Sequence, residues 1–353
     1  MISSNETAIS VIIPVHNGGG NFRACLLSLQ AADPPPHEII VVSDGDTGDS
    51  GRLAEKFDAE VLRNPNPEGP AHARNMGARH AKGDILFFVD ADVSIKPDAM
   101  DRVAAAFKND AALAAIFGSY DDEPFETNFL SQYKNLFHHY VHHTAKREAS
   151  TFWGACGAIK RKIFFKIGGF NEKYCPRRGT SAPGTVEDIE LGYRLRNAGY
   201  PIELVKELKV KHLKRWTLSS LLKADIFYRA VPWARLILAE GRFLNDLNTK
   251  ISDRISVLCI GLATAMIPAS CFAPWCIVPA AILLGTVFWL NRDLYRFFRN
   301  KRGPGFALKA IFWHWFYLFY SGLTFAALWA HDKTKKAWAG ACERVLESRG
   351  QDE

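Results

Sequence analysis

The sequence predicts an α/β domain with a mostly parallel sheet, followed by interfacial helices and a carboxyl-terminal transmembrane helical region. In the first half of the 353-residue chain, short apolar runs alternate with segments of helical periodicity, a pattern typical of βαβ units. In the second half, long stretches carry no charge, and basic residues flank them.

The strands predicted for the first hundred residues are apolar runs bounded by polar or turn-forming residues. They are Ile9–Val15, Glu38–Ser43, Ala59–Arg63 and Ile85–Val89. Between them lie segments of helical periodicity, Phe22–Gln30, Gly51–Phe57 and Pro70–His80. Pro70 stands at the first helical turn, where helices accept proline. Alternation of this kind places ligands at the carboxyl ends of the strands.

The next part of the chain is less regular and is predicted to complete the domain. Its predicted helices are Pro97–Asn109, Asn128–Lys146, Ile163–Ile167 and Glu187–Asn197. Its predicted strands are Ala114–Tyr120, Phe152–Ile159, Ile202–Leu204 and Leu208–His212. Leu218–Leu247 then has mixed apolar and basic faces with tryptophan, which favours helices at a membrane interface.

Two later stretches are long and apolar enough to span or enter a bilayer, at about 20 residues per helix. Ile255–Leu290 carries no charge and contains three prolines, so we expect a helical hairpin or re-entrant pair that breaks near Ala273-Pro274. Ala310–Ala330 contains no Asp, Glu, Lys or Arg, and its one histidine is His314. The alternative, a buried core helix, fits the 36-residue uncharged run poorly.

The net charge of +7 is concentrated beside these stretches. Residues 201–254 hold 11 Lys and Arg against 6 Asp and Glu, and residues 291–303 hold 5 against 1. Such basic flanks mark the cytoplasmic face of a membrane and favour anionic headgroups. A nucleic-acid surface is the alternative for this charge, but no nucleic-acid-binding motif is present, so we expect no nucleic-acid partner.

The amino-terminal residues MISSNETAIS contain no basic or apolar signal region, so we expect the first 250 residues in the cytosol and the chain in the cytoplasmic (inner) membrane as a multi-pass protein. Lys333, Lys335 and Lys336 follow the last stretch and also favour the cytosol, which leaves the side of the carboxyl terminus open. The seven cysteines have no paired spacing, as expected for free thiols in a reducing compartment.

Asp90 and Asp92 directly follow the predicted strand Ile85–Val89. Two hard oxygen donors at the carboxyl end of a strand suit a Mg²⁺ or Mn²⁺ ion that also holds substrate phosphates. The alternative is a solvated loop with two surface acids, and the neighbouring motifs decide between the two.

Five segments, in order, resemble the glycosyltransferase family 2 pattern on the GT-A fold. They are SVIIPVHN, VVSDGDTGD, GPAHARNMGARHAKGDILFFVDADV, GACGAIKRKIFFKIGGFNE and VEDIELGYRLRNAGY. The resemblance covers about residues 9 to 216 and implies a GT-A nucleotide-sugar-binding, Rossmann-like mixed sheet. Five ordered motifs are far more specific than any one of them.

The chain departs from the family pattern at three places. Ser43 replaces the first acid of the Asp-Asp-Gly-Ser turn, which leaves Asp44 as the candidate to contact the nucleotide base. His16 stands in the segment where the family has an early acid. The Gln-x-x-Arg-Trp signature of processive synthases is only partly present, as Leu213–Trp216, so we expect transfer of a single sugar.

The resemblance assigns site residues on the donor side. The donor site would comprise Pro14, His16, Asp44, Arg74, Asp90, Ala91 and Asp92. Asp92 would bind the metal directly, Asp90 would contact the ribose or the ion, and Arg74 would contact the base or a phosphate. His212 would complete the metal site, since imidazole suits Mn²⁺; a hydrogen-bonded structural histidine is the alternative.

On the acceptor side, Asp188 would be the general base and Glu187 would orient the acceptor or cap the helix. An acid that complements the helix dipole is the alternative for Asp188. The acceptor-side residues would be Gly154, Gly157, Trp153 and Arg178, with core packing the alternative for Trp153 and a solvated loop for Arg178. For the histidines at 138, 139, 142 and 143, an amphipathic face is favoured over a zinc site.

We therefore expect a catalytic domain over residues 1–216, juxtamembrane helices over 217–254, a transmembrane region over 255–330 and a tail over 331–353. The expected reaction is inverting, metal-dependent transfer of one sugar from a UDP- or GDP-linked donor to a lipid or polyprenyl-linked acceptor at the cytosolic face. One alternative is a sugar-phosphate nucleotidyltransferase, although the loop HNGGGN lacks the lysine such enzymes usually carry. The other is a non-catalytic nucleotide-sugar-binding membrane protein.

Overall fold

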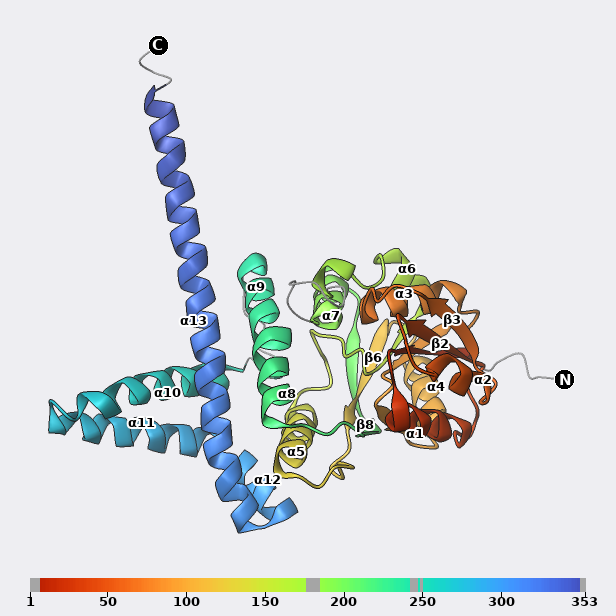
Figure 1. Ribbon diagram of the computed structural model, residues 1–353, viewed down its shortest axis with the longest axis horizontal. Coiled ribbons are helices and arrows are strands. Elements are labelled where there is room, and N and C mark those ends of the chain that lie inside the picture. Colours follow the sequence, from red (N-terminus) through yellow and green to blue (C-terminus); the bar gives the residue numbers. More distant parts are fainter. Residues whose placement is uncertain (1–6, 176–184, 242–246, 248–249, 350–353) are drawn as a thin grey trace. The chain divides into compact units, whose positions relative to one another are not determined.

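The computed structural model describes residues 7–175, 185–241, 247 and 250–349, and for 337 and 339–349 the backbone alone (Figure 1). Arg178 lies outside the described residues. The chain forms two compact units. The first holds the described residues up to Leu221 together with Leu247, and the second holds the others.

Within the described residues, the first unit is built on a mixed sheet of eight strands in the order β3-β2-β1-β4-β7-β6-β8-β5. β1 to β4 run parallel, β7 is antiparallel to β4 and β6, β6 is parallel to β8, and β5 is antiparallel to β8. The strands are β1 Ile9–Val15, β2 Glu38–Asp44, β3 Glu60–Asn64, β4 Ile85–Val89, β5 Val93–Ile95, β6 Ala115–Tyr120, β7 Cys156–Lys160 and β8 Ile202–His212.

Helices of the first unit pack on this sheet. They are α1 Gly19–Gln30, α2 Ser50–Glu55, α3 Pro70–His80, α4 Ala99–Asn109, α5 Phe129–Thr144, α6 Arg161–Lys166 and α7 Glu187–Asn197, with the 3₁₀ turn η1 Glu172–Tyr174. α3 lies so close to β1 that a Cβ on Gly77 would stand 2.5 Å from Ile12 Cγ2. A glycine at this point is therefore a condition for packing the helix that carries Arg74.

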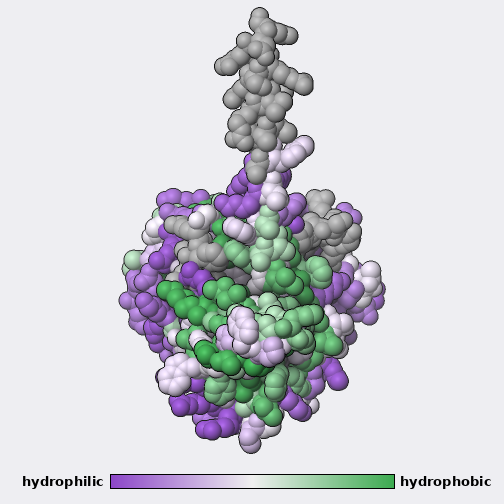
Figure 2. Space-filling view, turned by 90° about the vertical axis from the view of Figure 1, so that its left-hand side faces the viewer, coloured by the Kyte–Doolittle hydropathy of each residue, from purple (hydrophilic) through white to green (hydrophobic). Residues whose placement is uncertain are grey.

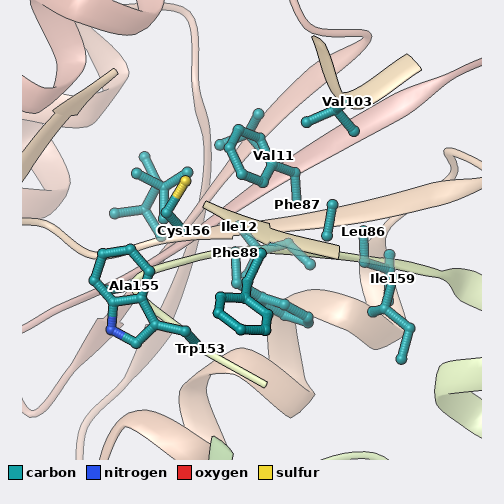
Figure 3. Close-up of a cluster of buried hydrophobic side chains, with 14 of the residues drawn as sticks. Val11, Ile12, Leu86, Phe87, Phe88, Val103, Trp153, Ala155, Cys156 and Ile159 are labelled. Atoms are coloured by element: carbon teal, nitrogen blue, oxygen red, sulfur yellow. The ribbon is translucent and has the colours of Figure 1, made fainter. Parts of the chain in front are cut away.

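The core is centred on β1 and β4, whose residues are apolar on both faces of the sheet. Figure 3 shows side chains of β1, such as Ile12, gathered with Phe87, Phe88 and Trp153. The ring of Phe88 meets Phe170 edge-on at 5.0 Å between ring centroids. Burial of β4 on both faces is what holds Asp90 at the end of a rigid strand.

The structure departs from the predicted elements where backbone geometry intervenes. β7 begins at Cys156 and not at Phe152, because the chain turns back on itself there: a Cβ on Gly157 would lie 2.4 Å from Trp153 O. The two strands predicted for residues 202–212 are one strand, β8, whose pairing with β6 shifts in register beside Gly118. The short β5 went unpredicted because its three residues show no period.

The second unit contains a helical hairpin with the break predicted near Ala273-Pro274. Its elements are α8 Leu218–Lys223 (which crosses the unit boundary), the π-helix η2 Ala224–Ala230, α9 Val231–Glu240, α10 Ile251–Ala269, the 3₁₀ turn η4 Pro274–Cys276, α11 Ile277–Leu290, α12 Arg292–Arg302 and α13 Pro304–Arg349. Cys259 and Ile260 of α10, Val287 of α11 and Leu318 of α13 form its buried apolar cluster.

One helix among the described residues, α10, is long and apolar enough to cross a membrane by length and composition. Residues Pro274–Leu290 and Arg292–Arg302 meet the same criterion only as a pair bent by 62°. The stretch Ala310–Ala330, predicted as a further span, lies inside α13 and does not meet it, because its Trp, Tyr and His side chains lower the hydropathy. A multi-pass arrangement is therefore not supported.

Gly192 provides a test of how α7 is positioned. A Cβ at this residue would lie 2.4 Å from backbone atoms of Thr151 and Phe152. We expect Gly192→Ala to lower the free energy of unfolding by about 1–3 kcal/mol through overpacking, despite the higher helix propensity of alanine. Gly20→Ala, at a position of α1 with no neighbour within 4 Å, should not destabilise the chain and should gain up to about 1 kcal/mol from helix propensity. Urea unfolding measures both, and equal stability of Gly192→Ala and the wild type would contradict this packing.

Candidate active site

The candidate site lies at the carboxyl ends of β1, β2 and β4, where His16, Asp44 and Asp90 stand. β1 pairs with β2 on one side and with β4 on the other, so the strand order reverses direction at this point. Open α/β sheets bind ligands at such a reversal. The carboxyl-terminal edge of the sheet thus brings together residues predicted for the donor site.

Arg74 is the centre of the site. It is 4% exposed on α3, and its two terminal nitrogens each donate to a different carboxylate, Glu187 Oε1 and Asp90 Oδ1, both at 2.7 Å. Gly154 lies against its guanidinium, since a Cβ there would stand 3.1 Å from Arg74 Cζ. Arg74 was predicted to contact the donor's base or phosphate. In the structure it is paired with two acids of the chain, because burial of its charge requires partners within the protein.

Glu187 is the most perturbed acid of this cluster. Burial raises its pKa to about 7, the charge of Arg74 opposes this rise, and the neighbouring Asp188 adds to it. Burial is the largest cause of this raised pKa, because it disfavours the charged form of the carboxyl group. For Arg74, burial acts to lower the pKa, but Asp90 and Glu187 outweigh it and raise the pKa.

Asp188, the predicted general base, lies half-buried in the first turn of α7. Its Oδ2 accepts a hydrogen bond from the backbone N–H of Gly154 at 3.1 Å, and its Oδ1 accepts one from Ile189 N at 2.8 Å. Gly154 thus touches both Arg74 and Asp188, which places this predicted acceptor-side residue in the cluster. At this position the charge of Asp188 also interacts favourably with the dipole of α7, which is the alternative role predicted for it.

The other described acceptor-side residues serve packing. Trp153 is 6% exposed, and the centroid of its ring lies 4.8 Å from that of Tyr120 and 4.7 Å from that of His138. It therefore packs in the core, which is the alternative predicted for it. Gly157 allows the tight turn before β7. The histidines of α5 also pack, with Nδ1 of His139 in hydrogen-bond contact with Tyr120 O at 2.8 Å.

Asp92 faces His212 across the last residues of the sheet. The pairing of Val93 with His212 brings the two together, and Leu213 N donates to Asp92 O at 2.8 Å. His212 Nε2 lies 3.7 Å from Asp92 Oδ2. Burial acts to raise the pKa of Asp92, but His212 and Lys214 outweigh it and lower the pKa. The carboxyl group of Asp92 thus lies beside the imidazole of His212, with its pKa below the usual range.

This pair fits part of the predicted metal site. A carboxylate oxygen and an imidazole nitrogen suit Mn²⁺, and substrate phosphate oxygens ordinarily supply further ligands to such an ion. Asp90 Oδ1 accepts a hydrogen bond from Arg74, which leaves Oδ2 as its other oxygen. Among the described residues, the one group of three His, Cys, Asp or Glu ligand atoms within 4.8 Å of one another is Glu68, His72 and Glu172.

Asp44 has a different surrounding from the one expected for a base-contacting acid. It is 4% exposed, and its carboxylate accepts hydrogen bonds from Asn64 Nδ2 and from the backbone N–H groups of Glu68 and Gly69. It therefore holds the loop that leads into α3. His16 Nδ1 contacts the carbonyl of Asp44 at 2.7 Å. Pro14 and Ala91 lie half-buried at the ends of β1 and β4.

Several residues of the site were missed from the sequence. Asp46 accepts from Asn17 N at 2.7 Å, and although burial acts to raise its pKa, hydrogen bonds from Asn17, Ser50 and Gly48 lower it. Asn75 Nδ2 donates to Phe170 O at 2.8 Å. Both stand inside quoted motifs, which could have marked them. Asn135, which contacts His212, stands in no motif at all.

The raised pKa of Glu187 has a consequence for stability. Because its pKa rises from about 4.5 to about 7 on folding, the folded chain binds more protons between these values, and the contribution of Glu187 to stability is lost as the pH rises through about 7. We expect Glu187→Gln, which cannot ionise, to flatten the pH dependence of the free energy of unfolding across this range. Urea unfolding at several pH values checks it, with the exposed Glu60→Gln as control. An unchanged slope in Glu187→Gln would count against the shift.

Comparison with known proteins finds a family model that matches the part of the chain carrying the donor-side strands. The model of "Glycosyl transferase family 2" matches residues 10–168. "Glycosyltransferase GlyG" of Streptococcus pneumoniae serotype 4 is 30% identical over 126 residues, 34% of the chain and 42% of the relative. "Validoxylamine A glucosyltransferase" of Streptomyces hygroscopicus subsp. limoneus is 25% identical over 241 residues, 58% and 51% respectively. The chain thus spans about half or less of the curated relatives it matches.

A solved structure shows the same fold. The mannosyltransferase PcManGT of Pyrobaculum calidifontis, in complex with GDP-Man and Mn²⁺, superposes with a TM-score of 0.56 at 16% identity, over 92% of this chain and 88% of that one. The mixed sheet, the Asp-x-Asp strand and the Glu-Asp helix agree with the family resemblance found in the sequence. Residues 10–168 are a glycosyl transferase family 2 domain, and the chain carries it on an α/β fold of the GT-A type.

Proposed function

We propose that this protein is an inverting, divalent-metal-dependent glycosyltransferase that moves one sugar from a UDP- or GDP-linked donor to a lipid or lipid-linked acceptor at the cytosolic face of a membrane. The observation that carries the proposal is the cluster in which the buried Arg74 pairs with both Asp90 and the buried Glu187, beside Asp188. One arginine joins an acid of the donor-side strand to the helix that bears the candidate base.

On the donor side, the bond between the anomeric carbon and the diphosphate breaks, and negative charge grows on the leaving diphosphate. A bound Mg²⁺ or Mn²⁺ would neutralise that charge as a Lewis acid. Asp92 and His212 are the residues that would hold it. Asp90, 32% exposed while Arg74 holds its Oδ1, keeps part of its carboxylate accessible to the donor's ribose. The GDP-Man and Mn²⁺ named for the mannosyltransferase structure accord with this donor class.

On the acceptor side, an acceptor hydroxyl attacks the anomeric carbon from the face opposite the diphosphate, and Asp188 accepts its proton. The N–H of Gly154 orients the Asp188 carboxylate. A polyprenyl phosphate acceptor would already carry an anionic oxygen and would need this base less. Glu187, paired with Arg74, fixes the start of α7 rather than taking the proton itself.

Two other functions are weaker. A sugar-phosphate nucleotidyltransferase would release pyrophosphate from a nucleoside triphosphate, and the loop after β1 lacks the lysine expected for this chemistry. A non-catalytic nucleotide-sugar-binding protein would not need acids of the donor side and of the acceptor side in one cluster. The curated relatives bear the names of glycosyltransferases, which accords with transfer.

The membrane part of the proposal rests on the α10–α11 hairpin. Figure 2, which faces the hairpin, shows hydrophobic side chains gathered over it. At its turn, Phe272 is 94% exposed and Trp275 71% exposed. The opposite end of α11 leads into α12, whose exposed basic residues are Arg296, Arg299, Lys301 and Arg302. We propose that the hairpin enters the bilayer turn first while α12 stays at the anionic headgroups.

A donor panel tests the reaction. Purified protein with membrane lipid extract and Mn²⁺ should transfer sugar from one UDP- or GDP-linked donor and release the nucleoside diphosphate. With a hydroxyl acceptor, we expect Asp188→Asn to lower kcat about 10²–10⁴-fold, because the proton loses its acceptor. The control is Asp49→Asn, at an exposed residue outside the cluster. Pyrophosphate release would favour the nucleotidyltransferase, and no transfer with any donor would remove the enzyme proposal.

Vesicle binding tests the hairpin. We expect the double variant Phe272→Asp, Trp275→Asp to lose roughly tenfold or more in affinity for anionic vesicles, because two apolar side chains no longer enter the bilayer. Phe125→Asp, at a residue of the first unit that is 61% exposed, is the matched control and should bind as the wild type does. Vesicle flotation measures all three.

Cys271 provides a second readout at the hairpin turn. It is exposed, whereas Cys25, Cys156, Cys175, Cys259 and Cys276 are buried. In a Cys342→Ser background, vesicles should protect Cys271 from a water-soluble maleimide. Labelling at the same rate with and without vesicles would contradict insertion of the turn.

A further inference from the structure

The surroundings of His212 go beyond the motifs of the family pattern. His212 is 4% exposed at the end of β8, and its Nδ1 lies 2.8 Å from Oδ1 of Asn135, a residue of α5 that is 1% exposed. An amide oxygen only accepts hydrogen bonds, so in this contact Nδ1 carries the proton and donates it. In the neutral imidazole, the form that can bind a cation, the ring therefore presents an unprotonated Nε2 on its other side.

The Nε2 nitrogen of His212 faces the carboxylate of Asp92. Nε2 of His212 and Oδ2 of Asp92 stand 3.7 Å apart, which is too far for a good hydrogen bond. Two ligand atoms at about 2.1 Å from one octahedral cation lie about 3 Å apart, and a wider angle at the ion separates them further. A nitrogen lone pair and a carboxylate at 3.7 Å are thus arranged to share a cation.

A second contact, with Tyr120, fixes the orientation of the His212 ring. Tyr120, the last residue of β6, stacks on His212 with ring centroids 4.5 Å apart and an interplanar angle of 18°. The hydrogen bond from Leu213 N to Asp92 O ties the backbones of the two groups together. The imidazole is therefore held by its plane, by its Nδ1–H and by its backbone.

We propose that Asn135 is a positioning residue that sets the tautomer of His212, so that Nε2 and Asp92 together bind the divalent cation of the donor site, with Tyr120 holding the plane of the ring. The proposal rests on the proposed function only for the identity of that site. Partners of this kind on the outer nitrogen of a metal-binding histidine orient the ligand and raise its basicity, and losing one typically weakens metal affinity about 10–100-fold.

The test measures binding of MnCl₂ to the purified protein, alone and with UDP or GDP, by electron paramagnetic resonance. Spin-echo modulation from a directly bound ¹⁴N should appear in the wild type and disappear in His212→Ala. Asn135→Leu, which removes the acceptor at similar size, should weaken Mn²⁺ binding about 10–100-fold. Asn135→Asp, which still accepts from Nδ1–H, should retain it.

Ser131→Ala is the matched control. Ser131 also lies buried on α5, and its Oγ accepts from Trp216 N at 2.8 Å, in the segment just after His212. This variant loses a comparable contact without touching the imidazole and should bind Mn²⁺ as the wild type does. Urea unfolding of the metal-free proteins reports whether each variant is folded.

The outcomes separate this proposal from the enzyme proposal. Absence of ¹⁴N modulation in the wild type under all three conditions, or equal weakening in Asn135→Leu and Ser131→Ala, would overturn the role of Asn135. Weaker Mn²⁺ binding in Asn135→Asp than in Asn135→Leu would also overturn the role of Asn135. It would mean that the amide matters for packing and not as an acceptor for Nδ1–H of His212. Sugar transfer is assayed separately, so transfer without ¹⁴N modulation removes this proposal alone.

Discussion

The burial of one guanidinium is the constraint on which the candidate site depends. A charged group removed from water must be paired within the protein, and Arg74 meets this requirement at its two terminal nitrogens, each 2.7 Å from a carboxylate, while its buried Nε has no hydrogen-bond partner. Those carboxylates, Asp90 and Glu187, stand almost one hundred residues apart in the chain. The pairing thus holds α3, the end of β4 and the start of α7 in one arrangement.

The burial of Arg74 also affects the acids of the donor side and of the acceptor side. Burial raises the pKa of Glu187, and the negative charge of Asp188 adds to the rise, while the charge of Arg74 opposes it. Asp188 lies next to this cluster yet takes its hydrogen bonds from backbone N–H groups. Two adjacent acids of one helix turn therefore have different surroundings, one buried against an arginine and the other half-exposed. This is the kind of difference that separates a positioning acid from a base.

Much of the fold could be predicted because its signals are local. The strand at Ile85–Val89 and the helices at Pro70–His80 and Glu187–Asn197 have the predicted bounds, since apolar runs, proline and acidic first turns mark them in the sequence. The single strand β8 could not be told from two strands, because its register shift depends on the close approach of Gly118 to Leu208 O. The stretch Ala310–Ala330 was predicted as a span because it lacks charge, but its Trp, Tyr and His residues keep its hydropathy below that of a membrane span.

The sequence by itself determined the α/β alternation, the order of the family motifs and the chemical types gathered at the strand ends, because these depend on residues close together in the chain. Only the tertiary structure decided which of those residues meet. It directed Arg74 to Asp90 and Glu187, left Asp44 to a loop, and set Asn135 against His212. The physical reason is that a buried polar group takes its partners from whatever side chains the packed sheet and helices bring within about 3 Å, and that distance has no signature in the order of residues.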